Sequence, residues 1–199
     1  MPRALALALA LATAPLGGCV DAASATAPGT SAAPPVAAAP APAELPPPPL
    51  DVGPEPLRGG LPGLRAVAEA VVDGLGRGDA GALAAVLVDE DEYKRRLFPH
   101  LANHANAHQM GPDLLWQMQS GESLDDMDRA LRLHGGRPLR LVDVRPAAVE
   151  RRGGLVLHRA PVLVVTTEDG ETRELRLLAT VIEHEATGTC RLLAYRLRG

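Results

Sequence analysis

The feature that most limits how this chain folds is the stretch 20–60, which is dominated by Ala, Pro, Ser and Thr and includes Pro34-Pro35 and the run Pro46–Pro49. Such a segment has too little apolar bulk to form a core, and its prolines favour the extended polyproline II form. At about 3.1 Å per residue it reaches on the order of 120 Å. We therefore expect a disordered tether over 19–60 and one globular domain over 61–199, which is long enough for a substantial core.

The first eighteen residues have the pattern of a secretory signal. Arg3 is followed by an apolar run from Ala4 to Ala14, built almost entirely from Ala and Leu, and then by small residues. This order of a basic, an apolar and a small-residue region is typical of a signal peptide. The run is far shorter than the roughly 20 residues that a membrane-spanning helix needs, so we do not expect a permanent transmembrane segment.

The sequence Leu16-Gly17-Gly18-Cys19 resembles the signal of bacterial lipoproteins, in which a Leu and two small residues precede a Cys. The resemblance implies that 1–18 are removed, that the Cys19 thiol is diacylated and that its new amino group is acylated with a palmitate-like chain. Several acyl chains on one residue give stable membrane attachment, whereas one chain does not. Val20, in place of Asp, implies outer-membrane sorting if the cell is Gram-negative. The alternative is an ordinary secretory signal cut near Ala22 or Ala23.

Helices are predicted over the first half of the domain. Apolar residues recur at helical spacing over 62–76, and Gly76 and Gly78 end that helix. Asp79 suits the N-cap of a second helix that ends near Leu87, and Asp89 that of a third over Glu90–Leu97, with Pro99 closing the section. The acidic first turn and basic last turn of the third helix match the helix dipole, which explains its charges without a function.

The next stretch, His100–Gly111, is rich in Asn and poor in apolar bulk, and we interpret it as a loop or a frayed helix. A helix is predicted from Pro112 or Asp113, then a break after Gly121. Ser123 and Asp126 form a capping signature for a further helix, which ends at His134 before two glycines and has Leu124, Met127 and Leu131 facing inward.

Beyond these helices the apolar period changes to two. Strands are predicted over Leu139–Val144, Leu155–Thr167, Glu171–His184 and Arg191–Arg198, with Pro161 requiring a bulge or an edge. The predicted fold class is α+β, with N-terminal helices packed on a four-stranded antiparallel meander.

Several pieces of this domain resemble a known superfamily. They are the segment GRGDAGALAAVL over 76–87, Phe98-Pro99-His100-Leu101, Trp116 and Gly135-Gly136-Arg137. With the order of helices before strands, they resemble the nuclear-transport-factor-2-like or SnoaL-like superfamily, and within it a subgroup of uncharacterised secreted proteins. The resemblance implies a cone-shaped curved sheet that wraps helices around a pocket. The superfamily includes isomerases and dehydratases that use an Asp or His base with Tyr donors.

Charge and cysteine usage narrow the classes of function. The formal net charge of −4 argues against a nucleic-acid partner. Residues 61–136 hold seven Lys or Arg against twelve Asp or Glu, whereas 137–199 hold eleven against eight. This asymmetry indicates solvated faces of opposite sign, or an Arg-lined surface on the C-terminal half that receives an anionic group. With Cys19 lipidated, Cys190 has no disulfide partner, and we expect it to be a small buried apolar residue.

Four residues are candidate ligand-binding residues: Tyr93, Phe98, His104 and Trp116. The three aromatic side chains could line a cavity between helices and sheet, although the simpler interpretation places them in the core. Tyr93 and Tyr195 are the available phenol donors, but no Asp is singled out as a catalytic base.

Three other polar clusters have simpler interpretations than a metal or catalytic site. His100, His104 and His108 stand four apart, so a neighbouring pair could chelate a metal, but a solvated polar loop is the simpler interpretation and we expect no metal site. We interpret Glu183-His184-Glu185 as solvated turn residues. Asp125, Asp126 and Asp128 lack the Gly and distal Glu of a calcium loop, and we interpret them as helix N-terminal acids.

These observations favour a membrane-anchored envelope lipoprotein, whose domain binds a partner protein or a small ligand without catalysis and without a cofactor. The alternatives are an isomerase- or hydratase-type enzyme of the same fold and an accessory subunit of an envelope assembly. A cavity of about 300 Å³ or more between helices and sheet would favour ligand binding.

Overall fold

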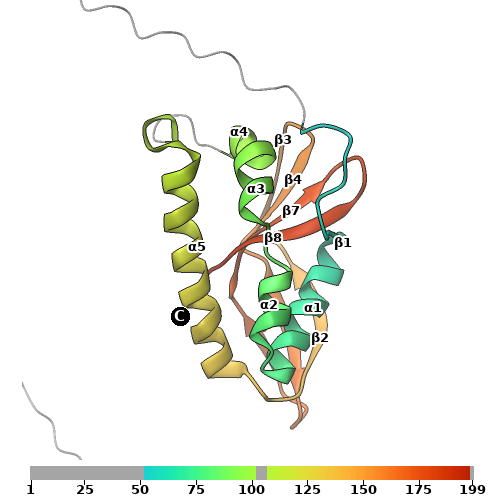
Figure 1. Ribbon diagram of the computed structural model, residues 1–199. Helices are drawn as coiled ribbons and strands as arrows, with labels where there is room; N and C mark the ends of the chain where they lie inside the picture. The colour runs from blue at the N-terminus through green and yellow to red at the C-terminus, as the bar shows by residue number, and fades with distance from the viewer. Residues whose placement is uncertain (1–51, 102–106, 198–199) are drawn as a thin grey trace, which may run out of the picture. The chain divides into compact units, whose positions relative to one another are not determined.

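The computed structural model describes residues 52–101 and 107–197, which form an α+β domain with helices preceding most of the strands (Figure 1). His104 lies outside the described residues, as do the signal sequence, Cys19 and Val20. The helical segments, in chain order, are α1 (Gly63–Arg77), α2 (Ala80–Ala85), α3 (Glu90–Glu92), the π-helical η1 (Tyr93–Leu97), α4 (Phe98–Leu101) and α5 (Ala107–His134).

The strands are β1 (Leu61–Pro62), β2 (Leu139–Arg145), β3 (Ala148–Arg152), β4 (Leu155–Arg159), β5 (Val162–Thr167), β6 (Thr172–Leu175), β7 (Leu178–His184) and β8 (Thr189–Tyr195). They form a five-stranded sheet in the order β1-β8-β7-β4-β3 and a three-stranded sheet in the order β2-β5-β6. All strand pairings in these sheets are antiparallel.

The first three helix starts are confirmed. Helix α1 buries its apolar stripe, and the amide of Gly78, in the left-handed conformation (φ 66°), closes the last turn. Asp79 Oδ1 accepts a hydrogen bond from the Ala82 amide at 2.9 Å, and Asp89 Oδ1 accepts one from the Glu92 amide at 2.8 Å. These side chains satisfy amides that the first helical turn leaves unpaired.

Two predicted helix boundaries are wrong. Pro99 does not end the third helical section, because the chain continues from η1 into α4. Gly121 does not break α5, which is helical from Pro112 to His134 after a non-helical Gly111 (φ 70°, ψ 164°). The Ser123 hydroxyl is buried in the middle of this helix and accepts a hydrogen bond from the Tyr195 amide at 2.9 Å. The residue interpreted as a cap therefore joins α5 to β8.

Of the four predicted strands, Leu139–Val144 corresponds to β2 and Arg191–Arg198 overlaps β8, but the other two are each divided, so the four-stranded meander is not what the structure shows. The stretch Leu155–Thr167 is divided into β4 and β5 at Ala160 (φ 42°) and Pro161, and the stretch Glu171–His184 is divided into β6 and β7. Strand β3 was not predicted; it pairs with β4 through the turn at Gly153-Gly154. Proline has no amide hydrogen, so the interruption at Pro161 follows from its chemistry.

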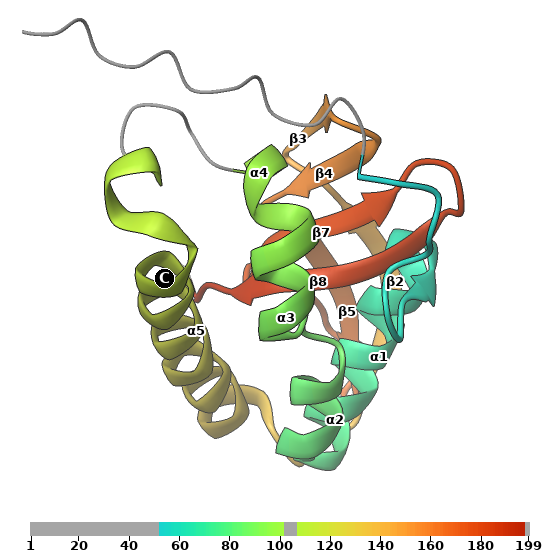
Figure 2. The same ribbon diagram turned by 45° about the horizontal axis from the view of Figure 1, so that its top comes forward.

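The five-stranded sheet has one apolar cluster on each of its two faces, and successive residues of its strands point alternately into one cluster and the other. Val181, Cys190 and Leu192 pack with α1, α2 and the three-stranded sheet, whereas Leu157 and Ile182 pack with η1 on the other face. Successive side chains of a strand point to opposite faces, so β7 contributes to both clusters. Figure 2 shows α3, η1 and α4 crossing one face of β7 and β8, with α5 to one side.

The domain extends further towards the N-terminus than the composition predicts. The leading segment (residues 52–60) was expected to belong to the tether, yet Leu57 is only 2% exposed. The Arg96 guanidinium donates to the backbone oxygens of Glu55 and Pro56, and His184 Nε2 lies 2.7 Å from the Gly53 oxygen. The segment is therefore part of the domain in spite of its composition, because the side chains of Val52 and Leu57 are buried and its backbone is hydrogen-bonded to Arg96 and His184.

The link between α5 and β8 yields a stability prediction. Replacing Ser123 with Ala leaves the buried Tyr195 amide without an acceptor, so we expect a loss of about 1 to 3 kcal/mol in the free energy of unfolding by urea. Ser120→Ala is the matched control, because the Ser120 hydroxyl contacts only the Gln117 carbonyl within its own helix at 3.4 Å. Equal effects of the two substitutions would contradict the inferred role.

Candidate functional site

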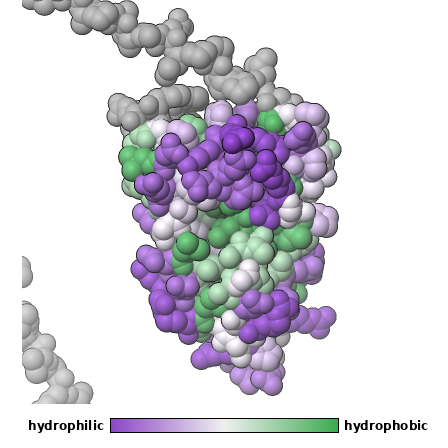
Figure 3. Space-filling model, in the orientation of Figure 1, coloured by the Kyte–Doolittle hydropathy of each residue, from purple (hydrophilic) through white to green (hydrophobic). Residues whose placement is uncertain are grey.

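An apolar groove of about 310 Å³ lies between α5, the α2–α3 region and β8; we call it the α5 groove. Its lining consists of Ala84, Leu87, Val88, Asp89, Trp116, Ser120, Ser123, Leu124, Arg191 and Leu193. Six of these ten residues are apolar or aromatic. Figure 3 shows an apolar area over α2 and beside α5, with hydrophilic residues above and below it.

The polar residues of the α5 groove hold its walls together. Ser123 binds the Tyr195 amide, and Asp89 caps α3. Arg191 Nη1 donates to the carbonyls of Gly59 (3.0 Å) and Ala85 (2.8 Å), and its Nη2 donates to the carbonyl of Leu87. Because these groups already have partners within the domain, the groove offers mainly apolar contact to a ligand.

Three of the four candidate ligand-binding residues come together next to the α5 groove. The ring centroids of Tyr93 and Trp116 are 5.1 Å apart, and those of Tyr93 and Phe98 are 6.2 Å apart in an edge-to-face arrangement. Tyr93 is buried, as the core interpretation expects, whereas Trp116 also lines the groove. The position of His104 lies outside the described residues, so its predicted role is still only a prediction.

Sequence reasoning missed most of the groove. Leu87 and Val88 are far from Leu193 in the sequence, and no spacing connects the two segments. Leu124, expected to face inward, is 46% exposed at the edge of the groove. One feature of the sequence did indicate an apolar surface on this side of β8: adjacent residues of a strand point to opposite faces, and both Leu192 and Leu193 are apolar. Leu192 lies in one apolar cluster and Leu193 packs against the other.

Helix α5 is apolar on two sides. Trp116 and Leu124 line the groove, whereas the exposed Leu114 and Met118 lie about half a turn away from Trp116 at 100° per residue. A helix that packs on a core by one face normally has a polar opposite face. The exposed apolar side chains therefore indicate a surface available for further packing.

Tyr195, His184 and His158 have structural partners in this domain. The Tyr195 hydroxyl donates to the Leu83 carbonyl at 2.9 Å, and burial raises the pKa of Tyr195. His184, interpreted as a solvated turn residue, is in fact buried and bound to the Gly53 oxygen. On the neighbouring strand, His158 Nε2 lies 2.7 Å from Glu183 Oε2, with His158 Nδ1 buried and without a hydrogen bond.

The predicted histidine cluster is only partly described. His100 is buried rather than solvated, and a Cβ on Gly153 (φ 51°) would lie 2.2 Å from its Nδ1, so Gly153 permits this close packing. Within residues 52–101 and 107–197, no group of three or more His, Cys, Asp or Glu side chains is placed to hold a metal ion. Asp125, Asp126 and Asp128 lie in the middle of α5 and not in its first turn, contrary to the prediction.

Comparison with protein-family models, curated proteins and solved structures found no match to this chain. In the described part of the chain, no helix has both the length and the apolar character needed to cross a membrane.

The prediction that Cys190 is a small buried residue is confirmed. Burial and the nearby Glu183 carboxylate raise the pKa of its thiol to about 12. In a chain carrying Cys19→Ser, we therefore expect no reaction with Ellman's reagent at pH 8 in the folded state and full reaction in denaturant. Leu133→Cys, which places a thiol at a 55% exposed position, should react at once. Rapid reaction of Cys190 in the folded chain would contradict this account.

Proposed function

We propose that this chain is a lipid-anchored envelope protein whose domain binds an apolar segment of a partner protein in the α5 groove. The observation that carries the proposal is an open apolar groove whose Ser123 and Arg191 are already hydrogen-bonded within the domain. Such a site gains free energy by removing apolar surface from water, at roughly 25 cal/mol per Å².

A macromolecular partner fits the site better than a small molecule. Leu124 at the edge of the groove and Leu114 and Met118 on the outer side of α5 leave apolar surface exposed on both sides of one helix. A small molecule in the groove would cover only one of these sides. A partner that packs along α5 can cover more, as in complexes where an amphipathic helix lies in a groove.

The charges of the surrounding helices indicate the chemistry of the partner. The groove is built mostly by helices from residues 61–136, which hold seven basic against twelve acidic residues. Acidic flanks attract basic groups and repel acidic ones, which affects the association rate more than the affinity. The partner segment is therefore an apolar stretch flanked by Lys or Arg.

The cone-shaped fold of the nuclear-transport-factor-2-like superfamily is part of the proposal. Its support is that β2 and β3, β4 and β5, and β6 and β7 are consecutive along the chain, and each of these pairs has one strand in each sheet. The neighbours correspond in the two sheets: β4 pairs with β3 and β7, and β5 pairs with β2 and β6. The two sheets can thus be treated as one sheet that bends at Ala160 and Pro161, with α1 packed inside the bend.

Anchoring at Cys19 is supported by the sequence pattern and has a direct test. Mass spectrometry of the mature protein should find an N-terminal cysteine at position 19 carrying acyl chains, and Cys19→Ser should release the chain from the membrane fraction. The matched substitution Cys190→Ser leaves the anchor in place and should not change fractionation. An unmodified N-terminus near Ala22 or Ala23 would favour the ordinary secretory signal.

Groove binding can be followed by fluorescence, because Trp116 is the only tryptophan in the sequence. The ligand is a short synthetic peptide with leucines at helical spacing and lysines at both ends, titrated into the chain with Cys19→Ser. We expect a blue shift of Trp116 emission, and binding weakened roughly five- to tenfold by Leu124→Ser, which removes apolar contact at the groove edge.

Two controls decide the outcome. Leu133→Ser changes an exposed leucine of α5 that does not line the groove, so it should leave binding unchanged. The same peptide with glutamates in place of its lysines should bind more weakly. Equal loss in Leu124→Ser and Leu133→Ser, or equal binding of both peptides, would contradict the proposed site.

A further inference from the structure

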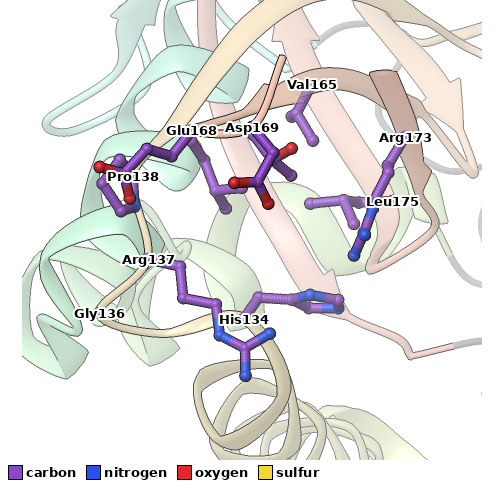
Figure 4. A pocket seen from close by; sticks show the side chains of 11 residues that line it. His134, Gly136, Arg137, Pro138, Val165, Glu168, Asp169, Arg173 and Leu175 are labelled. Carbon is purple, nitrogen blue, oxygen red and sulfur yellow. The ribbon is translucent and has the colours of Figure 1, made fainter. Parts of the chain in front are cut away.

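A second cavity, of about 270 Å³, lies at one end of the three-stranded sheet; we call it the His134 cavity. The register of the sheet explains how it forms. Leu139 of β2 pairs with Thr167 of β5, so the residues just before β2 and just after β5 lie close together. His134, the last residue of α5, and Arg137 line one side of this cavity, and Asp169 of the β5–β6 turn and Arg173 of β6 line the other. In Figure 4 the Arg173 side chain points towards His134, and the Arg137 guanidinium lies beside His134 and points away from Asp169.

The cavity combines both signs of charge with an apolar floor. Leu139, Val165 and Leu175 supply the apolar lining. Arg137 and Asp169 form no hydrogen bond or ion pair with any part of the chain that the structure describes, although they line the same space. Opposite charges that share a cavity without contact leave room for a ligand that contacts both.

Two guanidiniums, those of Arg137 and Arg173, form the cationic side of the cavity, next to the imidazole of His134. Burial, followed by the positive charges of Arg137 and then Arg173, lowers the pKa of His134 and so favours its neutral imidazole. Arg173 Nε also donates to Glu171 Oε2 at 3.1 Å, in an exposed pair on its own hairpin. Glu168 lines this cavity and also a neighbouring one, with Arg77 and Arg140.

We propose that the His134 cavity binds a small zwitterion, an α-amino acid with an apolar side chain. Its carboxylate lies against Arg137, Arg173 and His134, its ammonium group against Asp169, and its side chain on Leu139, Val165 and Leu175. A ligand with only a negative charge would be attracted by the arginines but repelled by Asp169. A ligand with only a positive charge would be attracted by Asp169 but repelled by the arginines. A ligand with both charges can contact the two arginines and Asp169 at the same time. The cavity is smaller than most sites for drug-sized ligands, which agrees with a small metabolite.

The test is calorimetric titration of the Cys19→Ser chain with L-leucine and two analogues that each lack one charge. These are 4-methylpentanoate, without the ammonium group, and 3-methylbutylamine, without the carboxylate. We expect leucine to bind and each analogue to bind at least about tenfold more weakly, because each loses a charge-assisted contact. Equal binding of leucine and either analogue, preferential binding of inorganic phosphate, or no binding of leucine would overturn the proposal.

Two substitutions assign the charges to their residues. Arg137→Gln should weaken leucine binding about tenfold. Asp169→Asn should weaken leucine binding but strengthen binding of 4-methylpentanoate, since it removes a repulsion that only the anion suffers. Arg140→Gln is the matched control, because Arg140 is exposed and lines only the neighbouring cavity of the two. An equal loss in Arg140→Gln would overturn the assignment, and the result does not depend on the peptide that binds the α5 groove.

Discussion

The buried guanidinium of Arg191 makes the hydrogen bonds on which the packing of the helices against strand β8 depends. From strand β8 it donates hydrogen bonds to the carbonyls of Gly59, Ala85 and Leu87, and so joins the leading segment, the end of α2 and the α2–α3 connection. Burial lowers the pKa of Arg191, while the carboxylates of Glu92 and Asp89 act in the opposite direction. A buried charge of this kind is costly unless its polar atoms are hydrogen-bonded, and here backbone carbonyls satisfy both terminal nitrogens of the guanidinium, whereas Nε is without a partner among the described residues.

The α5 groove follows from this contact. Arg191 fixes the α2–α3 wall against β8, and Ser123 fixes the α5 wall against the same strand through the Tyr195 amide. Both walls are thus held by side-chain contacts to one strand, and the apolar residues between them are left facing a shared space. Such a groove is pre-formed, which reduces the ordering cost of binding. The proposed anchor would place it on a long tether, within reach of partners near the membrane.

The sequence predicted those features that depend on neighbouring residues. Asp79 and Asp89 cap their helices as expected, because capping requires only the next three residues. The failures involve distant contacts: Ser123 serves Tyr195 and not its own helix, and the proline-rich leading segment is ordered by Arg96 and His184. Residue type alone singled out Tyr93, Phe98 and Trp116 as cavity or core residues, but it did not show that their rings meet. The His134 cavity was not, because strand register brings its residues together; the excess of Arg in the C-terminal half was the only hint.

We propose the α5 groove as the surface that receives an apolar, basic-flanked segment. Hydrogen–deuterium exchange of the Cys19→Ser chain, with and without saturating lysine-flanked peptide, tests it most directly, because it locates the bound peptide without assuming where it lies. We expect increased protection of the amides around Val88, along α5 from Trp116 to Leu124, and around Leu193. Protection confined to the outer strand β3 or to the three-stranded sheet would contradict it.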